Sequence, residues 1–351
     1  MEEDKPQVKG ILSKILDFYD REYKKLLIIP IILLVLAIAQ ISIQTATTGD
    51  FINKGVSLKG GITITILNEN IEVAQLETSL KSIFNNNDLS VRSLEKTGQI
   101  IGVAIEIDLD ESKTDSLIKE INTITGLDLK EGDYTIEVMG SSLGASFFKE
   151  ILKAIFIAFL FMGVVVFLYF GEGIKLKVIA AIMAFLSAIF IFVTKDPITD
   201  VISYILGIML IIIYLRSSIA SFAVILAAAS DIIITLAIIN LTGMKLSSAG
   251  IAAFLMLIGY SVDTDMLLST RVLKRKEGTV FDRVMSSFKT GILMSITTLT
   301  AVTIALIFTE SEVIRQIMVI LLVGLLVDLI NTWIQNVSIL RMWLDKKHKH
   351  N

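Results

Sequence analysis

The stretch LMLIGYSVDTDMLLSTRVLKRKEG, residues 255–278, decides the fold class of this chain. Its first half is apolar enough for a lipid bilayer, yet Asp263 and Asp265 follow before a basic end. An ionised carboxylate in hydrocarbon is costly, so such residues face protein or water rather than lipid. We therefore infer a membrane helix that belongs to a bundle with polar groups in its interior.

The composition of the whole chain supports a membrane location. Hydrophobic residues make up 54% of the 351 residues, against roughly 45–50% in soluble domains. The net charge of −3 argues against a nucleic-acid-binding surface. Cysteine is absent and the two histidines, His348 and His350, lie in the tail, so we expect no thiol or histidine chemistry, no metal site and no cofactor.

Eight apolar segments are long enough to cross a bilayer, for which roughly 20 residues suffice. They are residues 26–46, 149–170, 178–194, 200–215, 219–241, 248–268, 287–308 and 313–340. The third and fourth are short and tightly bounded, so they either cross as a pair or form a hairpin that stays within the membrane. The stretch 146–343 is therefore expected to be a helix bundle.

Basic residues predict the orientation. They gather before the first span, at 271–276 and in the tail 344–351, and cytoplasmic segments carry such an excess. We expect both termini in the cytoplasm. Residues 1–25 have apolar positions at helical spacing, which fits an amphipathic helix on the membrane surface or a solvated helix that leads into the first span.

Residues 47–145 differ from the rest because they are polar, and their apolar residues recur at the spacing of strands in some segments and of helices in others. The expected order is βαββαβ, with strands at 62–67, 90–94, 100–109 and 134–139 and helices at 71–84 and 112–124. This order predicts a ferredoxin-like α+β domain outside the cell membrane. Its strand edges could hold an extended chain by strand addition, or the domain could be a rigid docking head.

Four carboxylates fall inside the apolar spans and are the candidate site: Asp231, Asp263, Asp265 and Asp328. Asp263 and Asp265 project about 200° apart on a helix of 3.6 residues per turn, so they cannot face the same neighbour. A carboxyl group removed from water can load and release a proton, which makes a proton relay one interpretation. The other is that these groups only hold helices together by hydrogen bonds.

Several motifs around these residues resemble a known family. GYSVDTD (259–265), followed by RVLKR (271–275), is similar to the fourth-span motif of the SecD/SecF family of protein-export membrane proteins, in its archaeal SecF branch. The motif places Gly259, Ser261 and Thr264 at helix-packing positions beside the candidate relay. Leu58, Gly60 and Gly61 resemble the Gly-Gly motif that enters the outer domain, and Ser230-Asp231 resembles the third-span motif.

The resemblance implies an RND-superfamily bundle with six core spans. It implies pairing with SecD, association with the SecY translocon and contact with the translocating preprotein and membrane lipid, with the proton gradient driving late translocation. The chain departs from the pattern of this family in two ways. Residues of about 174–214 form an insertion of two spans, and the bacterial motif has its carboxylate where this chain has Thr264, so either Asp263 or Asp265 takes that role.

Three alternatives remain at this level. An RND-type half-transporter of small molecules or lipids would need a larger outer domain than about 99 residues. An intramembrane aspartyl protease would need a Gly-x-Gly-Asp motif, which the sequence lacks, so we do not expect an enzyme. A non-catalytic scaffold of the translocon is the rival if the carboxylates only join helices.

Overall fold

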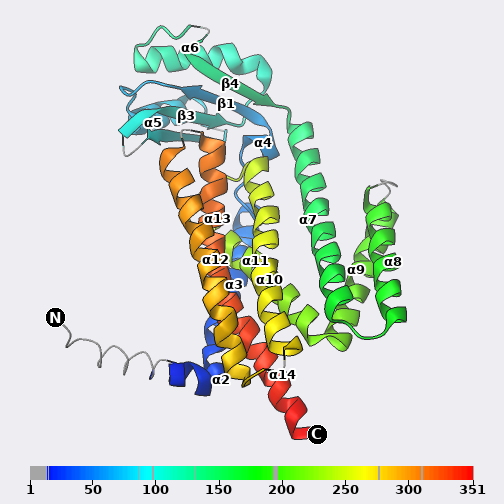
Figure 1. Ribbon diagram of the computed structural model, residues 1–351. Helices are drawn as coiled ribbons and strands as arrows, with labels where there is room; N and C mark the ends of the chain where they lie inside the picture. Colours follow the sequence, from blue (N-terminus) through cyan, green and yellow to red (C-terminus); the bar gives the residue numbers. More distant parts are fainter. Residues whose placement is uncertain are drawn as a thin grey trace, which may run out of the picture.

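The computed structural model describes residues 14 and 16–350, except 86, 97–98, 131, 193–196, 276 and 310. A domain of sheet and helices lies on one end of a bundle of long helices, and the first and last helices that the structure describes reach the opposite end (Figure 1). Of the predicted helix at 1–25, residues 16–21 are helical, and residues 1–13 lie outside the described part.

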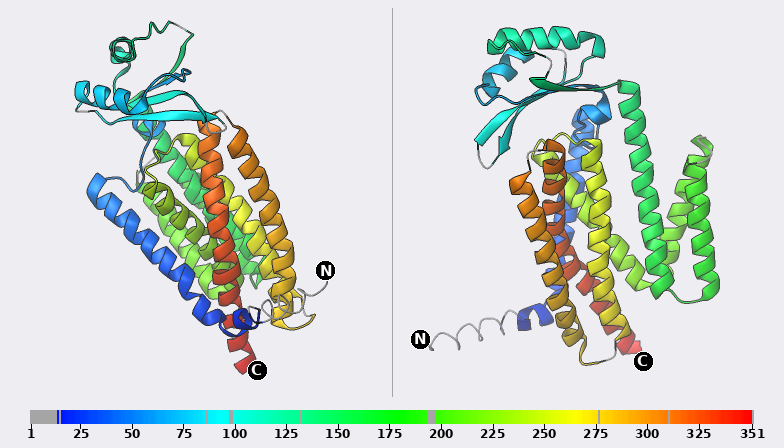
Figure 2. Two further views of the ribbon diagram at one scale, coloured as in Figure 1. Left: turned by 90° about the vertical axis from the view of Figure 1, so that its left-hand side faces the viewer. Right: turned by 45° about the horizontal axis from the view of Figure 1, so that its top comes forward.

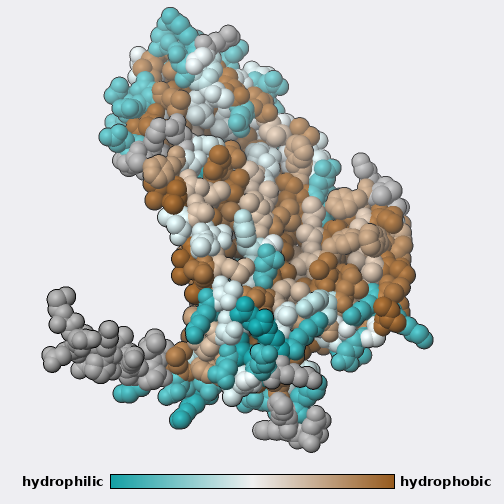
Figure 3. Space-filling view, viewed as in Figure 1, coloured by the Kyte–Doolittle hydropathy of each residue, from teal (hydrophilic) through white to brown (hydrophobic). Residues whose placement is uncertain are grey.

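Within the described residues, eight helices are long and apolar enough to span a membrane, as the sequence predicts. They are α3 (Ile28–Thr48, preceded by the short α2, Tyr23–Leu26), α7 (Ser141–Phe170), α8 (Ile174–Phe192), α9 (Pro197–Ser217), α10 (Ile219–Leu241), α11 (Ser248–Lys274), α12 (Val280–Phe308) and the continuous rod α13 (Glu312–Ile330), η2 (Asn331–Asn336) and α14 (Val337–His350). In the view of Figure 3 hydrophobic residues predominate over these helices, whereas hydrophilic residues gather on the domain and at the far end. The chain is therefore a multi-pass membrane protein.

Helix α10 lies at the centre of the bundle and packs against α3, α7, α11 and α13. Helices α10 and α11 are the most enclosed of the eight, whereas α12 leaves most of its side chains uncovered. Polar groups on α10, α11 and α13 consequently meet inside protein, and those on the outer face of α12 do not.

Helices α8 and α9 form a hairpin that packs on α7, on the side away from α12 and α13 (Figures 1 and 2). The hydroxyl groups of Ser187 on α8 and Ser203 on α9 lie 2.6 Å apart, and both are buried. Lys153 on α7 pairs with Asp200 on α9 at 2.8 Å, with both side chains largely buried. These polar contacts in an apolar setting explain why the two short spans occur as a pair.

The domain above the bundle contains a four-stranded antiparallel sheet in the order β2-β3-β1-β4. Its elements are β1 (Gly61–Ile66), α5 (Val73–Ile83), β2 (Leu89–Lys96), β3 (Gln99–Ile107), η1 (Glu111–Lys113), α6 (Thr114–Thr125) and β4 (Tyr134–Met139). Alternate residues of β1, namely Ile62, Ile64 and Ile66, are buried against Leu80 of α5 and Leu117 of α6. The other face of the sheet looks towards the bundle (Figure 1).

A short helix that the sequence analysis did not foresee, α4 (Val56–Lys59), precedes the first strand. Gly60 and Gly61 follow it with φ values of +96° and +133°, which only glycine adopts readily. A Cβ atom on Gly60 would collide with the backbone of Ser141 at the start of α7. The glycine pair therefore lets the junction of α4 and β1 lie directly against α7, while Leu58 is buried among bundle residues.

Polar contacts attach the domain of residues 61–139, called the outer domain from here on, to the loop between α10 and α11. Asp88, just before β2, accepts from Lys245 of that loop at 3.0 Å and from Lys59 at 3.3 Å. Partial burial opposes ionisation of Asp88, but the hydrogen bonds and charges of the two lysines outweigh it and lower the pKa of Asp88. Asp88 therefore stays charged and bridges the domain to the membrane region.

We expect Asp88→Asn to loosen the domain on the bundle at pH 7. Because the pKa of Asp88 is lower in the folded protein, the stabilisation from its ion pairs is complete above the ordinary aspartate pKa of about 3.9. That stabilisation is lost as the pH falls through the lower pKa that Asp88 has in the folded protein. Because the groups are half exposed, the effect is about 1 kcal/mol or less. Spin labels on α6 and on the α10–α11 loop would show a broader distance distribution.

Asp128→Asn is the matched control, since the ion pair of Asp128 with Lys130 stays within the outer domain. The interpretation is wrong if Asp88→Asn leaves the distribution unchanged at pH 7, or if acidification leaves the wild-type distribution unchanged.

Candidate functional site

Three of the four predicted carboxylates meet at one place in the bundle. Asp231 of α10, Asp265 of α11 and Asp328 of α13 are only 1%, 0% and 1% exposed. Asp263 lies apart from them, exposed on the outer face of α11. The spacing of two residues therefore separates one buried and one exposed carboxylate, as the helical geometry predicts.

Asp231 is held by groups from two neighbouring helices. Ser261 of α11 donates its hydroxyl hydrogen to Oδ2 at 2.5 Å, and the Asn331 amide of η2 donates to Oδ1 at 2.7 Å. Next to it, the Gln335 amide donates to Ser230 at 3.2 Å. Asp231 thus ties α10 to both α11 and the α13–η2 rod.

Asp265 and Asp328 share one hydroxyl group. Thr332 Oγ1 lies 3.0 Å from Asp265 Oδ1 and 3.0 Å from Asp328 Oδ1, and the Asn336 amide donates to the same Asp265 oxygen at 2.6 Å. A threonine hydroxyl carries one hydrogen and two lone pairs. With both carboxyl groups ionised, Thr332 shares its single hydrogen between the two oxygens, whereas a carboxyl proton gives each contact a hydrogen of its own.

Positive charge does not balance this cluster. The hydrogen bonds of the three carboxylates come from serine, threonine and asparagine, and in the described part of the chain none comes from lysine or arginine. Full ionisation would place three negative charges in a buried site with neutral partners, which is electrostatically costly. The cluster is therefore suited to holding protons and offers no binding partner for an anion.

The π-helix η2 supplies most of the hydrogen-bond donors. Asn331, Thr332, Gln335 and Asn336 all lie within its six residues, Asn331–Asn336, and all are at most 3% exposed. Such π turns inside α-helices are rare and occur often at functional sites. Thr332 and Asn336 are not among the candidate residues from the sequence, although steps of four residues from Asp328 place both on its face of the helix.

The predicted packing residues have different environments. Ser261 contacts the cluster directly. Thr264, at the position of the bacterial carboxylate, is buried instead towards Gly291 of α12. Gly259 faces open space on the outer side of α11, where an added Cβ atom would meet nothing within 4 Å. Helix α11 therefore has one side that faces the cluster, with Ser261, and an open side, with Gly259 and Asp263.

Helix α12 carries several serine and threonine residues, and the hydrogen bonds observed for their side chains do not go to the cluster. Thr297 donates to the Met294 carbonyl at 2.7 Å and Thr300 to the Ile296 carbonyl at 2.8 Å, both within the same helix. Arg271 donates to Ser286 and Thr290 rather than to a carboxylate. These polar groups of α11 and α12 therefore bond within their own helices or to each other and not to the carboxylate cluster.

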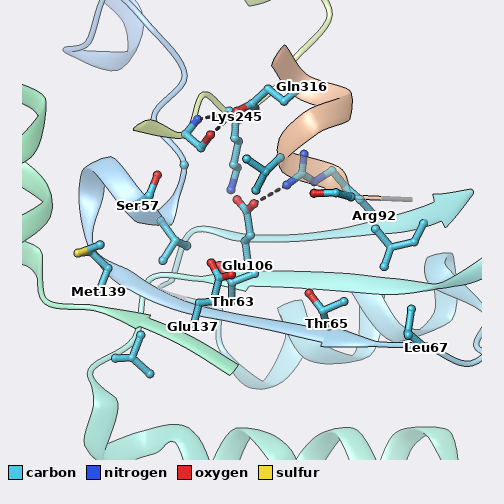
Figure 4. A pocket seen from close by; sticks show the side chains of 17 residues that line it. Ser57, Thr63, Thr65, Leu67, Arg92, Glu106, Glu137, Met139, Lys245 and Gln316 are labelled. Carbon is cyan, nitrogen blue, oxygen red and sulfur yellow. Dashed lines mark hydrogen bonds and ion pairs between the residues drawn. The ribbon is translucent and has the colours of Figure 1, made fainter. Parts of the chain in front are cut away.

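A second concave site lies between the open face of the sheet and the bundle. This outer groove has a volume of about 290 Å³ and is lined by Thr63 and Thr65 of β1, by Glu137 of β4 and by Lys245 and Gln316 from the bundle. Figure 4 shows the Arg92–Glu106 ion pair pointing into it from β2 and β3. The Gln316 amide group donates to the Lys245 carbonyl at 2.6 Å and its oxygen accepts from the Ser247 amide at 3.0 Å.

We expect Thr332→Val to destabilise the bundle by about 1–3 kcal/mol, because two buried carboxyl groups lose a shared partner. Thermal unfolding in detergent or nanodiscs would measure the change. Thr297→Val makes the same chemical change on the exposed face of α12 and should leave stability unaltered within about 0.5 kcal/mol. Equal effects of the two substitutions would show that the shared hydroxyl does not stabilise the cluster.

Comparisons with known proteins agree with this architecture. The family described as "Protein export membrane protein SecD/SecF, C-terminal" matches residues 193–346. The SecF protein of Pyrococcus furiosus is 32% identical over 97% of this chain and 98% of its own length. That of Methanocaldococcus jannaschii is 34% identical over 92% of this chain and 96% of its own.

A solved structure shares the fold. The crystal structure of SecDF from Thermus thermophilus, described as a translocon-associated membrane protein, superposes with a TM-score of 0.59 at 18% identity over 93% of this chain. This chain spans 38% of that longer protein, and at such an identity the likeness concerns the fold alone. Because the archaeal relatives align over nearly their full length, the chain belongs to the SecF family of protein-export membrane proteins.

Proposed function

We propose that this chain is the subunit that joins a SecD partner in the cytoplasmic membrane and, with the SecY translocon, assists export of preproteins by using the proton gradient. The observation that carries the proposal is the buried cluster of Asp231, Asp265 and Asp328, in which two carboxyl groups share the hydroxyl of Thr332. The role is that of a transport subunit rather than an enzyme.

The cluster supports proton coupling because its hydrogen bonds depend on its protonation. Thr332 has one hydrogen, so its contacts with Asp265 and Asp328 each have a hydrogen of their own only when a carboxyl proton is present. Loss of that proton leaves one hydrogen shared between two carboxylates and adds a negative charge in a buried site that no lysine or arginine of the described residues bonds. Each change in protonation therefore favours a different arrangement of α11 against the α13–η2 rod.

The partner SecD would cover the open side of α11. Asp263, Gly259, Tyr260 and Met256 are exposed there, next to the uncovered face of α12. A carboxylate facing lipid in mid-span is costly, whereas a second membrane subunit can supply hydrogen bonds to it. The lack of a side chain at Gly259 leaves space for close approach of a partner helix.

The inserted hairpin leaves this surface free. Helices α8 and α9 pack on α7, across the bundle from α12 (Figure 1). We therefore propose that residues of about 174–214 widen the bundle towards lipid and do not block the docking of SecD.

The outer domain is proposed to be a ferredoxin-like unit on the extracytoplasmic side. Its βαββαβ order and antiparallel sheet order β2-β3-β1-β4 support the fold assignment. The basic tail and the basic end of α11 lie at the opposite end of the bundle, which supports cytoplasmic termini. The outer groove would then face the side on which a preprotein emerges.

A scaffold of the translocon is the rival function, because the same hydrogen bonds hold α10, α11 and η2 together. The two functions differ in one respect: a scaffold needs the bonds, whereas a relay needs a carboxyl group that ionises. Asparagine in place of Asp265 retains much of the shape and polarity but cannot carry the proton.

We expect Asp265→Asn to assemble with SecD and to lose the stimulation of preprotein translocation by the proton gradient, leaving the gradient-independent rate. Translocation into vesicles with and without an imposed proton gradient measures this. Full stimulation in the variant would disprove the relay and leave the scaffold.

We expect Asp263→Leu to weaken association with SecD roughly 3- to 20-fold, the range that one interhelical hydrogen bond gives in membranes. A fluorescence energy-transfer titration of the two labelled subunits in liposomes measures the dissociation constant. Met256→Leu on the same face, which conserves volume, should leave it within about twofold. Unchanged affinity of the Asp263 variant would place the SecD interface elsewhere.

A further inference from the structure

The π-helix η2 is held not only by the carboxylates above it but also by the N-terminal segment below it. Tyr19 donates its phenol hydrogen to the backbone carbonyl of Trp333, in the middle of η2. A π turn disturbs the regular pairing of helix carbonyls, and a buried carbonyl without a partner is costly. Tyr19 therefore supplies a bond to the backbone at the place where the helix itself is irregular.

The environment of Tyr19 keeps this bond in place at all physiological pH values. Its ring packs in the cluster formed by Trp333, Val284, Val337 and Leu340. Burial raises the pKa of the Tyr19 phenol, against a smaller lowering by the charge of Arg341. The phenol stays protonated and remains a hydrogen-bond donor.

Further contacts fix the N-terminal segment, residues 19–23, to α14. Arg341 donates to the Asp20 carboxylate at 2.6 Å, and its guanidinium lies 4.3 Å from the centre of the Tyr23 ring. Ser338 donates to the Tyr23 carbonyl at 2.9 Å, and Tyr23 also bonds Asp345. We call this set of contacts between residues 19–23 and α14 the N-terminal clamp; α2 lies beside α14 in the left view of Figure 2.

The clamp and the carboxylate cluster act on the same six residues. Thr332, which Asp265 and Asp328 share, directly precedes Trp333, and Asn336, which bonds Asp265, lies three residues after it. The Trp333 ring packs between Phe288 and Gly291 of α12, and the ring centroids of Trp333 and Phe288 lie 5.1 Å apart. A shift of the Trp333 backbone therefore moves the groups that hold Asp265.

We propose that Tyr19 is a positioning residue: its hydroxyl, held by the N-terminal clamp, keeps η2 in the register that presents Thr332 and Asn336 to Asp265. The effect of Tyr19 on export rests on the proposed function, whereas its effect on η2 does not. The bond also joins the cytoplasmic end of the chain to the centre of the membrane region.

The chain offers a direct reporter of this register. Trp333 and Trp343 are its two tryptophans, so a Trp343→Phe background leaves the emission of Trp333 alone. In that background Tyr19→Phe removes one oxygen and keeps the packed ring. Tyr214→Phe is the matched control, because the buried Tyr214 hydroxyl has no hydrogen-bond partner among the described residues.

With the full chain in nanodiscs, we expect Tyr19→Phe to shift the emission of Trp333 and to raise its accessibility to acrylamide at least about twofold, whereas Tyr214→Phe changes neither. An unchanged Trp333 signal in Tyr19→Phe, or equal changes in both variants, overturns the proposal. The fluorescence tests the role of Tyr19 in η2 even if Asp265→Asn proves that the relay itself is wrong.

The second measurement is export. With SecD and the translocon present, Tyr19→Phe should lower the gradient-stimulated part of translocation about threefold or more and spare the gradient-independent part, whereas Tyr214→Phe lowers neither. If Tyr19→Phe changes the Trp333 signal but keeps full stimulation of translocation by the gradient, the claim that the register of η2 serves Asp265 is wrong. The proposed function would still stand in that case if Asp265→Asn abolishes the stimulation.

Discussion

The cost of an ionised carboxylate in hydrocarbon is the constraint on which the rest of this molecule depends. Asp231, Asp265 and Asp328 come from three different helices, yet all are buried in one cluster with neutral donors. That arrangement places α10 at the centre, with α11 and the α13–η2 rod against it, and four buried polar side chains of η2 beside the carboxylates. The architecture of the bundle follows from the need to keep these groups away from lipid.

The same constraint explains which features the sequence reveals. Apolar length alone identifies the eight spans, and helical geometry separates Asp263 from Asp265, because both depend on neighbours in the chain. The family is equally visible, since the motif at 259–265 is local. Even the strands of the outer domain lie within a few residues of their expected bounds, because period-two burial is written into β1 as Ile62, Ile64 and Ile66.

What the sequence does not reveal depends on contacts between distant segments. Thr332 and Asn336 bond Asp265 across 67 and 71 residues of chain, and nothing local in NTWIQN indicates which distant carboxylate these side chains meet. Tyr19 lies more than 300 residues from the carbonyl that it bonds. The threonines of α12 show that polar residues in a span need not form a site: a hydroxyl in a membrane helix can bond its own backbone, as Thr297 does.

The α13–η2–α14 rod connects the two ends of the molecule through the cluster. Near its outer end, Gln316 holds the loop that carries Lys245, and through Lys245 the outer domain at Asp88. In its middle, Thr332 holds the carboxylates, and at its other end Arg341 holds the N-terminal segment. A change in protonation that shifts η2 along or around its axis must therefore alter contacts at both membrane surfaces, since a continuous helix transmits displacement along its length. In the proposed function, the rod would be the route by which a proton bound at the cluster changes the position of the domain at the end of the bundle.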